Sequence, residues 1–332
     1  MTARQSKMFI PAMLGLLFAV LMLSLAVGAE AIPPGRLLAA MVGHGSRIDS
    51  LILWQIRVPR AILGAAVGAS LGLAGAALQG LMRNPLVEPG LVGVSGGASL
   101  GAVIAFYSGA VTSFPASVPL AGFAGALVVT AVLAGLAATG TRVAVLVLFG
   151  VALSSLTGGL TALALNLAPS PFAVMEIVFW LLGSLADRSM QHVVLALPAM
   201  AVGWAILLSA GRGLEALTLG EAAAQSLGID MRRLTLTVIL GTALAVGPAV
   251  AVTGTIGFVG LVVPHLIRPW VGSRPGSVLW GSALGGAALL TAADLLVRIA
   301  PTFVQLKVGV VTSLIGAPFF MLLLLRRQGR AE

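Results

Sequence analysis

The stretch QIRVPRAILGAAVGASLGLAGAALQGLMRNPLVEPGLVGVSGGASLG, at residues 55–101, decides the fold of this chain. It enters with Arg57, Pro59 and Arg60 and continues for about twenty residues without a charge, the length that crosses a bilayer. A polar break at residues 83–90 follows, and a second apolar, glycine-rich segment begins behind it. Backbone amides inside a bilayer must be satisfied within a helix, while breaks lie at its faces or are buried in protein. The stretch therefore predicts two membrane segments joined by a tight turn.

The composition of the whole chain agrees with this prediction. The 332 residues are 59% apolar and only 9% charged, whereas a soluble domain carries roughly 25% charged residues. The absence of cysteine excludes disulfides and thiolate metal sites, and three histidines are too few for a multi-histidine site. The formal charge of +9 is spread over isolated basic residues, so no basic groove for nucleic acid is expected.

Apolar runs of spanning length recur along the chain and predict an all-α, polytopic membrane protein with about ten transmembrane helices. We assign one transmembrane domain to residues 1–332. Two prolines open each of two shorter stretches, residues 33–42 and 171–182, which we expect to be helices at a membrane face. The predicted spans are residues 8–28, 61–82, 91–109, 118–138, 143–167, 192–210, 233–253, 255–270, 277–298 and 308–325.

Basic residues set the predicted orientation. With the N-terminus in the cytoplasm, twelve of the 19 lysines and arginines fall on the cytoplasmic side and seven outside, which favours both termini inside. The first apolar run resembles a signal peptide, but its length favours an uncleaved span. Glycines four apart, at 64, 68 and 72 and at 281 and 285, favour close helix packing, although small residues are also frequent in membrane helices generally.

Three motifs in this stretch carry a resemblance to a known family. The stretch is similar to the signature of the FecCD and cobalamin-type permeases. The motifs that match are, in this order, Arg57-Val58-Pro59-Arg60, Gln79 and the turn at residues 84–98. These permeases are the membrane subunits of type II ABC importers for iron siderophores, haem or vitamin B12. The resemblance implies the type II permease fold, a second copy of the chain, two cytoplasmic ATP-binding subunits and a periplasmic binding protein. The chain lacks a G-x4-G-K-[ST] phosphate loop, so we expect ATP to be used by the partner and no cofactor here.

The loop at residues 211–230 is the longest predicted cytoplasmic excursion and has a helical pattern. By itself it reads as an ordinary amphipathic loop helix. The resemblance implies that it is the coupling helix, which sits in a groove of the ATPase subunit and carries its closure into the membrane. The residues assigned to coupling are Leu219, Gly220, Glu221, Ala223, Ala224, Leu227 and Gly228.

A second glycine- and proline-rich box, residues 254–270, matches another family motif. His265 in this box could be a metal ligand or a proton relay, but no carboxylate or second histidine is near in sequence, so a structural role is favoured. With the first turn, the assigned motif residues are Asn84, Pro85, Glu88, Pro89, Gly257, Gly260, Pro264, His265 and Arg268.

Three arginines stand at the predicted outer ends of spans: Arg57, Arg60 and Arg298. Charges this close to hydrocarbon are costly unless they find a partner, so lipid-headgroup anchoring is one reading. The resemblance implies instead that they meet glutamates on a periplasmic binding protein, which accounts for the outer positive charge. Asp294 is four residues before Arg298 and predicts an i,i+4 ion pair.

The remaining features concern gating and the last span. Glu88 is expected to be structural, whereas Glu176 and Asp187 flank the region that forms an outer gate in relatives. The chain departs from the family with Gln305 in place of a glutamate and Lys307 in place of a proline, which raises the hypothesis of an extra contact for the binding protein.

Two classes of function remain open at this point. The resemblance favours a permease in the bacterial inner membrane that moves an iron chelate, a ferric siderophore or haem, into the cytoplasm, with cobalamin as the alternative cargo. A secondary transporter driven by an ion gradient would keep polar residues at the bilayer midplane, for which Gln79 and Asn166 are the main candidates. The chain itself is not expected to be an enzyme.

Overall fold

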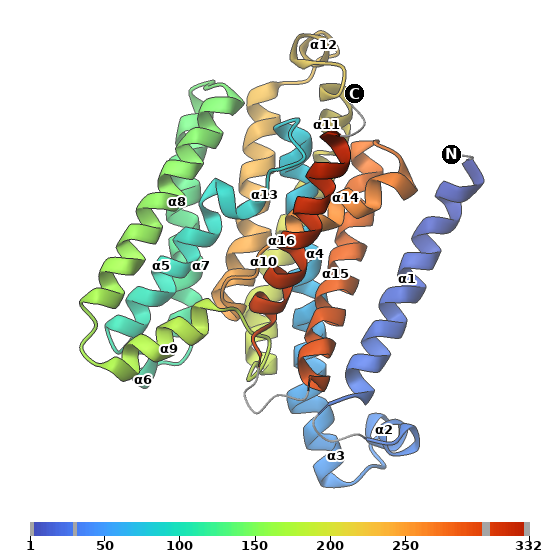
Figure 1. The fold of residues 1–332 in the computed structure, drawn as a ribbon, viewed down its shortest axis with the longest axis vertical. Coiled ribbons are helices and arrows are strands. Elements are labelled where there is room, and N and C mark those ends of the chain that lie inside the picture. Colours follow the sequence, from blue (N-terminus) through green and yellow to red (C-terminus); the bar gives the residue numbers. More distant parts are fainter. Residues whose placement is uncertain (1–2, 29–31, 301–305, 329–332) are drawn as a thin grey trace.

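The computed structural model describes residues 3–28, 32–300 and 306–328, and every regular element in these ranges is a helix. Figure 1 shows long helices running side by side as a bundle, with short helices at its two ends. This confirms the predicted all-α fold. One helix lies at each predicted span: α1 (Ala3–Ala26), α4 (Val58–Leu81), α5 (Val94–Tyr107), α7 (Ser117–Ala138), α8 (Val143–Asn166), α10 (Met190–Ser209), α13 (Met231–Thr253), α14 (Val259–Val271), α15 (Pro275–Ile299) and α16 (Val308–Gln328).

Not all of these helices are of spanning length. Within the described residues, 7 helical stretches are long and apolar enough to cross a membrane. Helices α5 and α14 have 14 and 13 residues, or about 20 Å each, which is less than a hydrocarbon core of about 30 Å. Helix α14 follows the non-helical residues 254–258, and α5 follows the non-helical residues 82–88 and the 3-10 turn η2 (Pro89–Val92). Val87, Pro89 and Val92 are buried, so the last part of the first turn is backbone that neighbouring helices cover.

Short helices mark the two ends of the bundle (Figure 1). One end carries α11 (Gly211–Leu217) and α12 (Glu221–Ser226), together with the start of α1 and the end of α16; we call it the α12 end. The opposite end, the α2 end, carries α2 (Pro34–Met41), α3 (Arg47–Leu51), α6 (Ala110–Ser113) and α9 (Pro171–Leu181). Helices are thus confirmed at both predicted short stretches, as α2 and α9.

The second span begins earlier than predicted. Helix α3, the π-helical turn η1 (Ile52–Arg57) and α4 form one continuous rod, Arg47–Leu81, of 35 residues. Pro59 misled the prediction, since proline disfavours the interior of a regular helix. Its ring would clash with the carbonyl four residues back, and the wider π turn immediately before it relieves that clash.

Helix α4 lies at the centre of the bundle and packs most closely on α15. A Cβ atom built on Gly72 would lie 2.1 Å from the carbonyl oxygen of Ser282, and one on Gly68 would lie 2.2 Å from that of Gly286. The predicted glycine stripe of α4 is therefore a backbone-to-backbone contact. The second stripe also packs: a Cβ on Gly281 would lie 2.5 Å from a side-chain carbon of Ile267 on α14.

We expect Gly72→Val to destabilise the protein strongly. The two backbones would have to separate, and overpacking of this kind costs about 1–3 kcal/mol or more. The matched control is Gly135→Val on α7, where a built Cβ meets nothing within 4 Å. Thermal unfolding in detergent should show a lower melting temperature for Gly72→Val alone, and equal melting temperatures would contradict the close contact.

Candidate functional site

A short helical protrusion rises from the α12 end of the bundle (Figure 1). Helix α12 begins after Gly220 and ends before Gly228, and both glycines have positive φ angles, +106° and +83°. These angles favour glycine, so the two residues fix where the helix starts and stops. Ala224 is buried against the bundle, whereas Leu219 and Leu227 are 69% and 63% exposed. The two exposed leucines therefore flank α12 on the protrusion, Leu219 in the turn before the helix and Leu227 at its C-terminal cap.

Glu221 and Ala223, two other residues of the predicted coupling loop, lie on α12 itself. Glu221 lies in the first turn of α12, where a carboxylate favours the helix dipole, and its side chain is exposed. Ala223 is half-buried. A cavity of about 350 Å³ separates Glu221 and Gln225 from the loop between α7 and α8, with Arg142 and Arg232 at its edge.

Beneath this end, the two family motifs meet around the side chain of Gln79. The Gln79 Nε2 atom donates hydrogen bonds to the carbonyl oxygens of Val87 and Gly260, each at 3.2 Å. Its Oε1 atom accepts a 2.7 Å hydrogen bond from the Arg268 guanidinium. Gln79 therefore joins the end of α4 to the first turn and to the start of α14.

Glu88 makes a second link between the same two motifs. Its Oε2 atom accepts a hydrogen bond of 3.3 Å from the backbone N–H of Phe258, which has a positive φ of 66°. Burial raises the pKa of the Glu88 carboxyl, and the Phe258 N–H partly opposes that rise. Glu88 also borders a cavity of about 180 Å³ that reaches Ser95 and Thr255.

The other predicted motif residues have identifiable positions. Asn84 caps its own turn by accepting from the N–H of Leu86, and Pro89 lies against Gly260, whose added Cβ would be 2.8 Å from the Pro89 Cδ. Pro264 is buried, and Pro85 and His265 are half-buried. Gly257 has open space around it, so its role is not steric. Among the described residues, no three His, Asp or Glu side chains gather as a metal site.

We expect Gln79→Leu to lower the stability of the protein. The substitution removes the donor for two buried carbonyls, and each unsatisfied group costs about 1–3 kcal/mol. Gln191→Leu, at an exposed position on α10, is the control. The melting temperature in detergent should fall for Gln79→Leu only. Equal melting temperatures for the two variants would show that the Gln79 amide does not contribute to holding α4 and α14 together.

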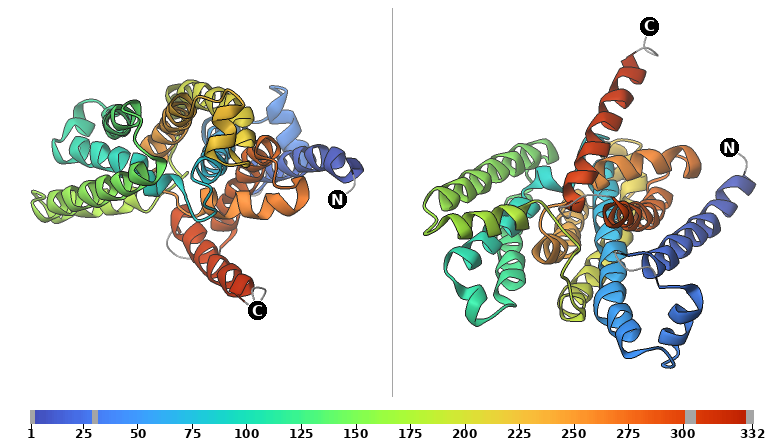
Figure 2. Two further views of the ribbon diagram at one scale, coloured as in Figure 1. Left: turned by 90° about the horizontal axis from the view of Figure 1, so that it is seen from above. Right: turned by 60° about the horizontal axis from the view of Figure 1, so that its bottom comes forward.

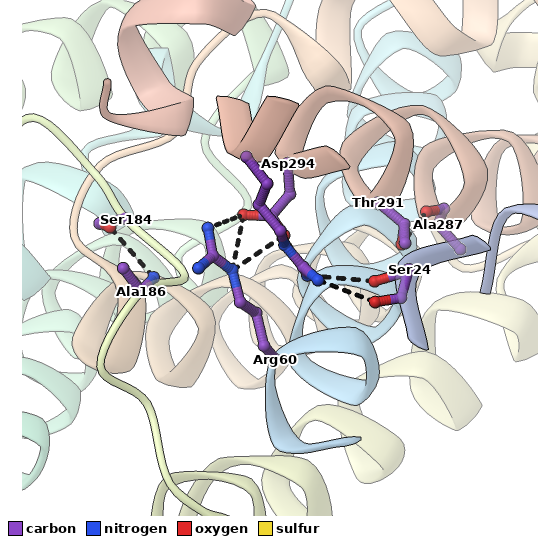
Figure 3. Close-up of polar contacts among 8 residues, drawn as sticks. Ser24, Arg60, Ser184, Ala186, Ala287, Thr291 and Asp294 are labelled. Carbon is purple, nitrogen blue, oxygen red and sulfur yellow. Dashed lines mark hydrogen bonds and ion pairs between the residues drawn. The ribbon is translucent and has the colours of Figure 1, made fainter. Parts of the chain in front are cut away.

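At the α2 end, a buried carboxylate gathers arginines from two helices (Figure 3). Asp294 on α15 is 1% exposed. Its Oδ1 atom accepts from Arg60 Nη2 at 2.8 Å, and its Oδ2 atom accepts from Arg298 Nε at 2.8 Å. Arg298 also donates to the carbonyl oxygen of Ser24 on α1 at 2.8 Å. The predicted Asp294–Arg298 pair is confirmed, and Arg60 is a third member that the sequence spacing could not show.

Arg57 also binds the end of α1. Its Nη1 atom donates to the carbonyl oxygens of Leu25 and Ala26 at 2.7 and 2.8 Å, and its side chain is buried. These carbonyls belong to the last turn of α1, which has no helical partner for them. The three arginines predicted to dock a binding protein are therefore largely enclosed, and each already holds part of the protein together.

A third junction at the α2 end brings three chain segments into backbone contact. Ser184 N–H donates to the Thr253 carbonyl at 2.7 Å, Thr255 Oγ1 donates to the Leu181 carbonyl, and Gly309 N–H donates to the Gly183 carbonyl at 3.2 Å. The junction ties α9 to the break after α13 and to the start of α16. Of the residues that flank it, Glu176 and Asp187 are exposed.

The departure from the family pattern lies next to this junction. The Lys307 ammonium stands 5.9 Å from the centre of the Phe179 ring on α9, within cation–π range. Gln305 lies outside the described residues. Lys307 therefore has a partner within the chain, a contact that the sequence did not predict.

The two polar residues considered for a secondary transporter, Asn166 and Gln79, do not lie where that class of protein requires them. Asn166 is the last residue of α8 and is exposed, and Gln79 lies in the last turn of α4. Neither occupies the middle of a broken helix, where ion-coupled carriers place such groups.

A bundle of apolar helices, several of them of membrane-spanning length, is the architecture of a polytopic transmembrane protein. The chain belongs to the FecCD transport family, which it matches over residues 16–326. It is thus a permease subunit of a type II ABC importer.

Relatives of known name agree with this assignment. The chain is 40% identical to the vitamin B12 import system permease BtuC of Vibrio cholerae, over 95% of this chain and 93% of that protein. It is 34% identical to the hemin transport system permease HmuU of Yersinia pestis, over 95% and 96%. A solved structure described as an inward-facing metal-chelate type ABC transporter superposes with a TM-score of 0.85 at 29% identity, covering 96% of this chain and 98% of that one.

Proposed function

We propose that this permease carries an iron chelate, a ferric siderophore or haem, from the periplasm to the cytoplasm of a bacterium. The similarity to a hemin permease and to a metal-chelate type transporter supports this cargo class. Cobalamin, another bulky metal chelate, is the second candidate because a vitamin B12 permease is 40% identical. The cargo is therefore a metal complex handed over intact, and the metal is part of the substrate.

The α12 protrusion is the observation that carries the mechanism. Two ATP-binding subunits would each receive one protrusion, with Leu219 and Leu227 seated in an apolar groove. On this proposal the α12 end, which also carries the start of α1 and the end of α16, faces the cytoplasm, and the excess of basic residues predicted for the cytoplasmic side supports that orientation. ATP-driven closure would move α12 and, through the Gln79 junction, the ends of α4 and α14.

A second copy of the chain would complete the pathway. Helix α8 is apolar over 24 residues, yet only Leu146, Gly150 and Thr157 are buried. Two such helices facing each other across a two-fold axis would enclose a wide, sparsely charged path that suits a bulky chelate. We assign the role of outer gate to the junction of α9, α13 and α16, which the hydrogen bonds between these segments support.

A periplasmic binding protein would deliver the cargo at the α2 end. Arg57, Arg60 and Arg298 carry three positive charges against the single Asp294, so this end keeps a positive field that attracts acidic residues of a partner. Because the arginines are largely enclosed, we assign them to orienting and steering the partner through this field.

Two measurements together identify the cargo: ligand binding by the partner binding protein and uptake by the complete importer. The binding protein that stimulates this permease should be titrated with a ferric siderophore, haem and cobalamin, and each ligand then offered to cells that express the complete importer. High affinity and uptake for an iron chelate support the proposal. Tight binding and uptake of cobalamin alone would assign the second candidate.

A further inference from the structure

The rod formed by α3, η1 and α4 is too long for a membrane. Its 35 residues span about 52 Å, against a hydrocarbon core of about 30 Å. The uncharged part from Ala61 to Leu81 alone fills that core. The remaining residues, 47–60, extend about 20 Å further at the α2 end, whereas one headgroup layer is only about 5–8 Å thick. The first turns of the rod therefore reach beyond the lipid.

An apolar stripe runs along this projecting part. Ile48, Leu51 and Trp54 are spaced three residues apart, so they share one face of the helix, and Ile48 and Trp54 are 67% and 50% exposed. Leu38 on α2 and Val42 at its C-terminal cap are also exposed, and α2 packs against this part of the rod through Leu37, Ala40 and Leu53. We call these five residues the outer ridge. Figure 2 shows α2 and α3 standing apart from the rest of the bundle when the α2 end is turned forward.

The outer ridge has a rigid base. Leu37, Ala40 and Leu53 form a small core with Ile32 between α2 and the rod. The buried Asp49 carboxylate accepts two hydrogen bonds of 2.6 and 3.0 Å from the Arg36 guanidinium. The Ser46 hydroxyl accepts a hydrogen bond from the backbone N–H of Asp49 and so caps α3. These contacts hold the apolar side chains in place, so ordering them on a partner costs little entropy.

The rim of the outer ridge is basic. The Arg36 side chain is 60% exposed even though it binds Asp49, and Arg47 and His44 are exposed nearby. Asp49 is the only acid between residues 32 and 60, and it is buried. A partner that covers the ridge should therefore present an apolar patch bordered by acidic side chains.

We propose that the outer ridge is a docking surface for the periplasmic binding protein. The inference rests on the proposed function and adds to it a contact area outside the enclosed arginines. The ridge continues directly into Arg57 and Arg60 along the same rod, so one partner can cover the ridge while it meets the positive field. An apolar stripe held beyond the headgroups would otherwise face water, which is unfavourable.

The chain contains no cysteine, which allows a direct test with single substitutions. Ile48→Cys and, as control, Phe18→Cys on the middle of α1 would be studied in the complete importer in nanodiscs. Phe18 is exposed in the monomer and is expected to face lipid. A membrane-impermeant maleimide should react with Cys at 48 and not with Cys at 18. Addition of the cargo-loaded binding protein should slow labelling at 48 at least fivefold.

Each other outcome rejects the inference. Failure of position 48 to react without binding protein would show that the ridge lies in lipid. Labelling that the binding protein leaves unchanged, although the same protein stimulates ATP hydrolysis by the importer, would show that docking occurs elsewhere. If no binding protein stimulates the unmodified importer, the proposed function fails as well, so the two failures are distinguishable.

A comparison of two charged substitutions at position 48 provides a second test. Ile48→Glu should weaken binding-protein affinity at least tenfold, because it opposes an acidic rim, whereas Ile48→Arg should weaken it less. The difference should shrink as salt is raised. Equal losses for both variants, independent of salt, would contradict the basic-rim argument.

Discussion

Replacing Leu219 and Leu227 together by glutamate is expected to abolish ATP-driven uptake and to separate the permease from its ATPase subunit. Both side chains are exposed and flank α12, Leu219 in the turn before it and Leu227 at its C-terminal cap, so they are available to an apolar groove of a partner. Central contacts of this kind cost about 2 kcal/mol or more when lost, which corresponds to roughly a 30-fold loss of affinity for each. Co-purification of the ATPase and initial uptake rate measure the effect.

The control for this prediction is Ser273→Glu, an exposed position in the turn between α14 and α15. It adds an acid to the same end of the bundle, away from α12, and should leave association within about twofold. The melting temperature of both variants should stay close to that of the unmodified permease, since no buried contact changes. Undiminished association and uptake in the double variant would show that α12 does not couple the subunits.

Removing the charge of Asp294 should have the largest effect on stability. Asp294→Asn leaves Arg60 and Arg298 without a counter-charge in a buried site, and breaking a buried ion pair costs about 3–5 kcal/mol. Asp230→Asn is the matched control because Asp230 forms an exposed pair with Arg233 and caps α13, and asparagine caps nearly as well. The control should cost less than about 1 kcal/mol.

Melting temperature and monodispersity in detergent would measure this difference. A triple variant, Arg60→Met, Asp294→Leu and Arg298→Met, should regain most of the lost stability, since a well-packed apolar set can replace buried ions. The triple variant should nevertheless bind the binding protein more weakly, because Arg57 is then the only charge left in this cluster and the positive field is smaller. Equal stability of Asp294→Asn and Asp230→Asn would contradict a buried ion cluster.

The sequence predicted the helices and their order well because each apolar run carries its own signal. It also predicted the Asp294–Arg298 pair, since residues four apart on a helix are neighbours. It could not predict that Arg60 joins them, because 234 residues separate Arg60 from Asp294. The close packing of α4 on α15, in which the glycine contacts take part, brings those helix ends together.

Two other features depended on tertiary contacts in the same way. The motifs at Gln79, Glu88 and Phe258 were visible separately, but their hydrogen bonds cross from the end of α4 to the start of α14. The outer ridge was hidden because Pro59 indicated a helix start where a π turn in fact continues the rod. A sequence signal was present in the spacing of Ile48, Leu51 and Trp54, which is helical.

The central claim is that this chain is a conduit whose energy comes from a separate ATPase. The most direct measurement is uptake of a radiolabelled chelate into proteoliposomes that hold the purified permease, with and without the ATPase subunit and binding protein. We predict accumulation only when both partners and ATP are present, with complete inhibition by vanadate and no effect of a protonophore. Accumulation by the permease alone, driven by an ion gradient and abolished by the protonophore, would contradict the account.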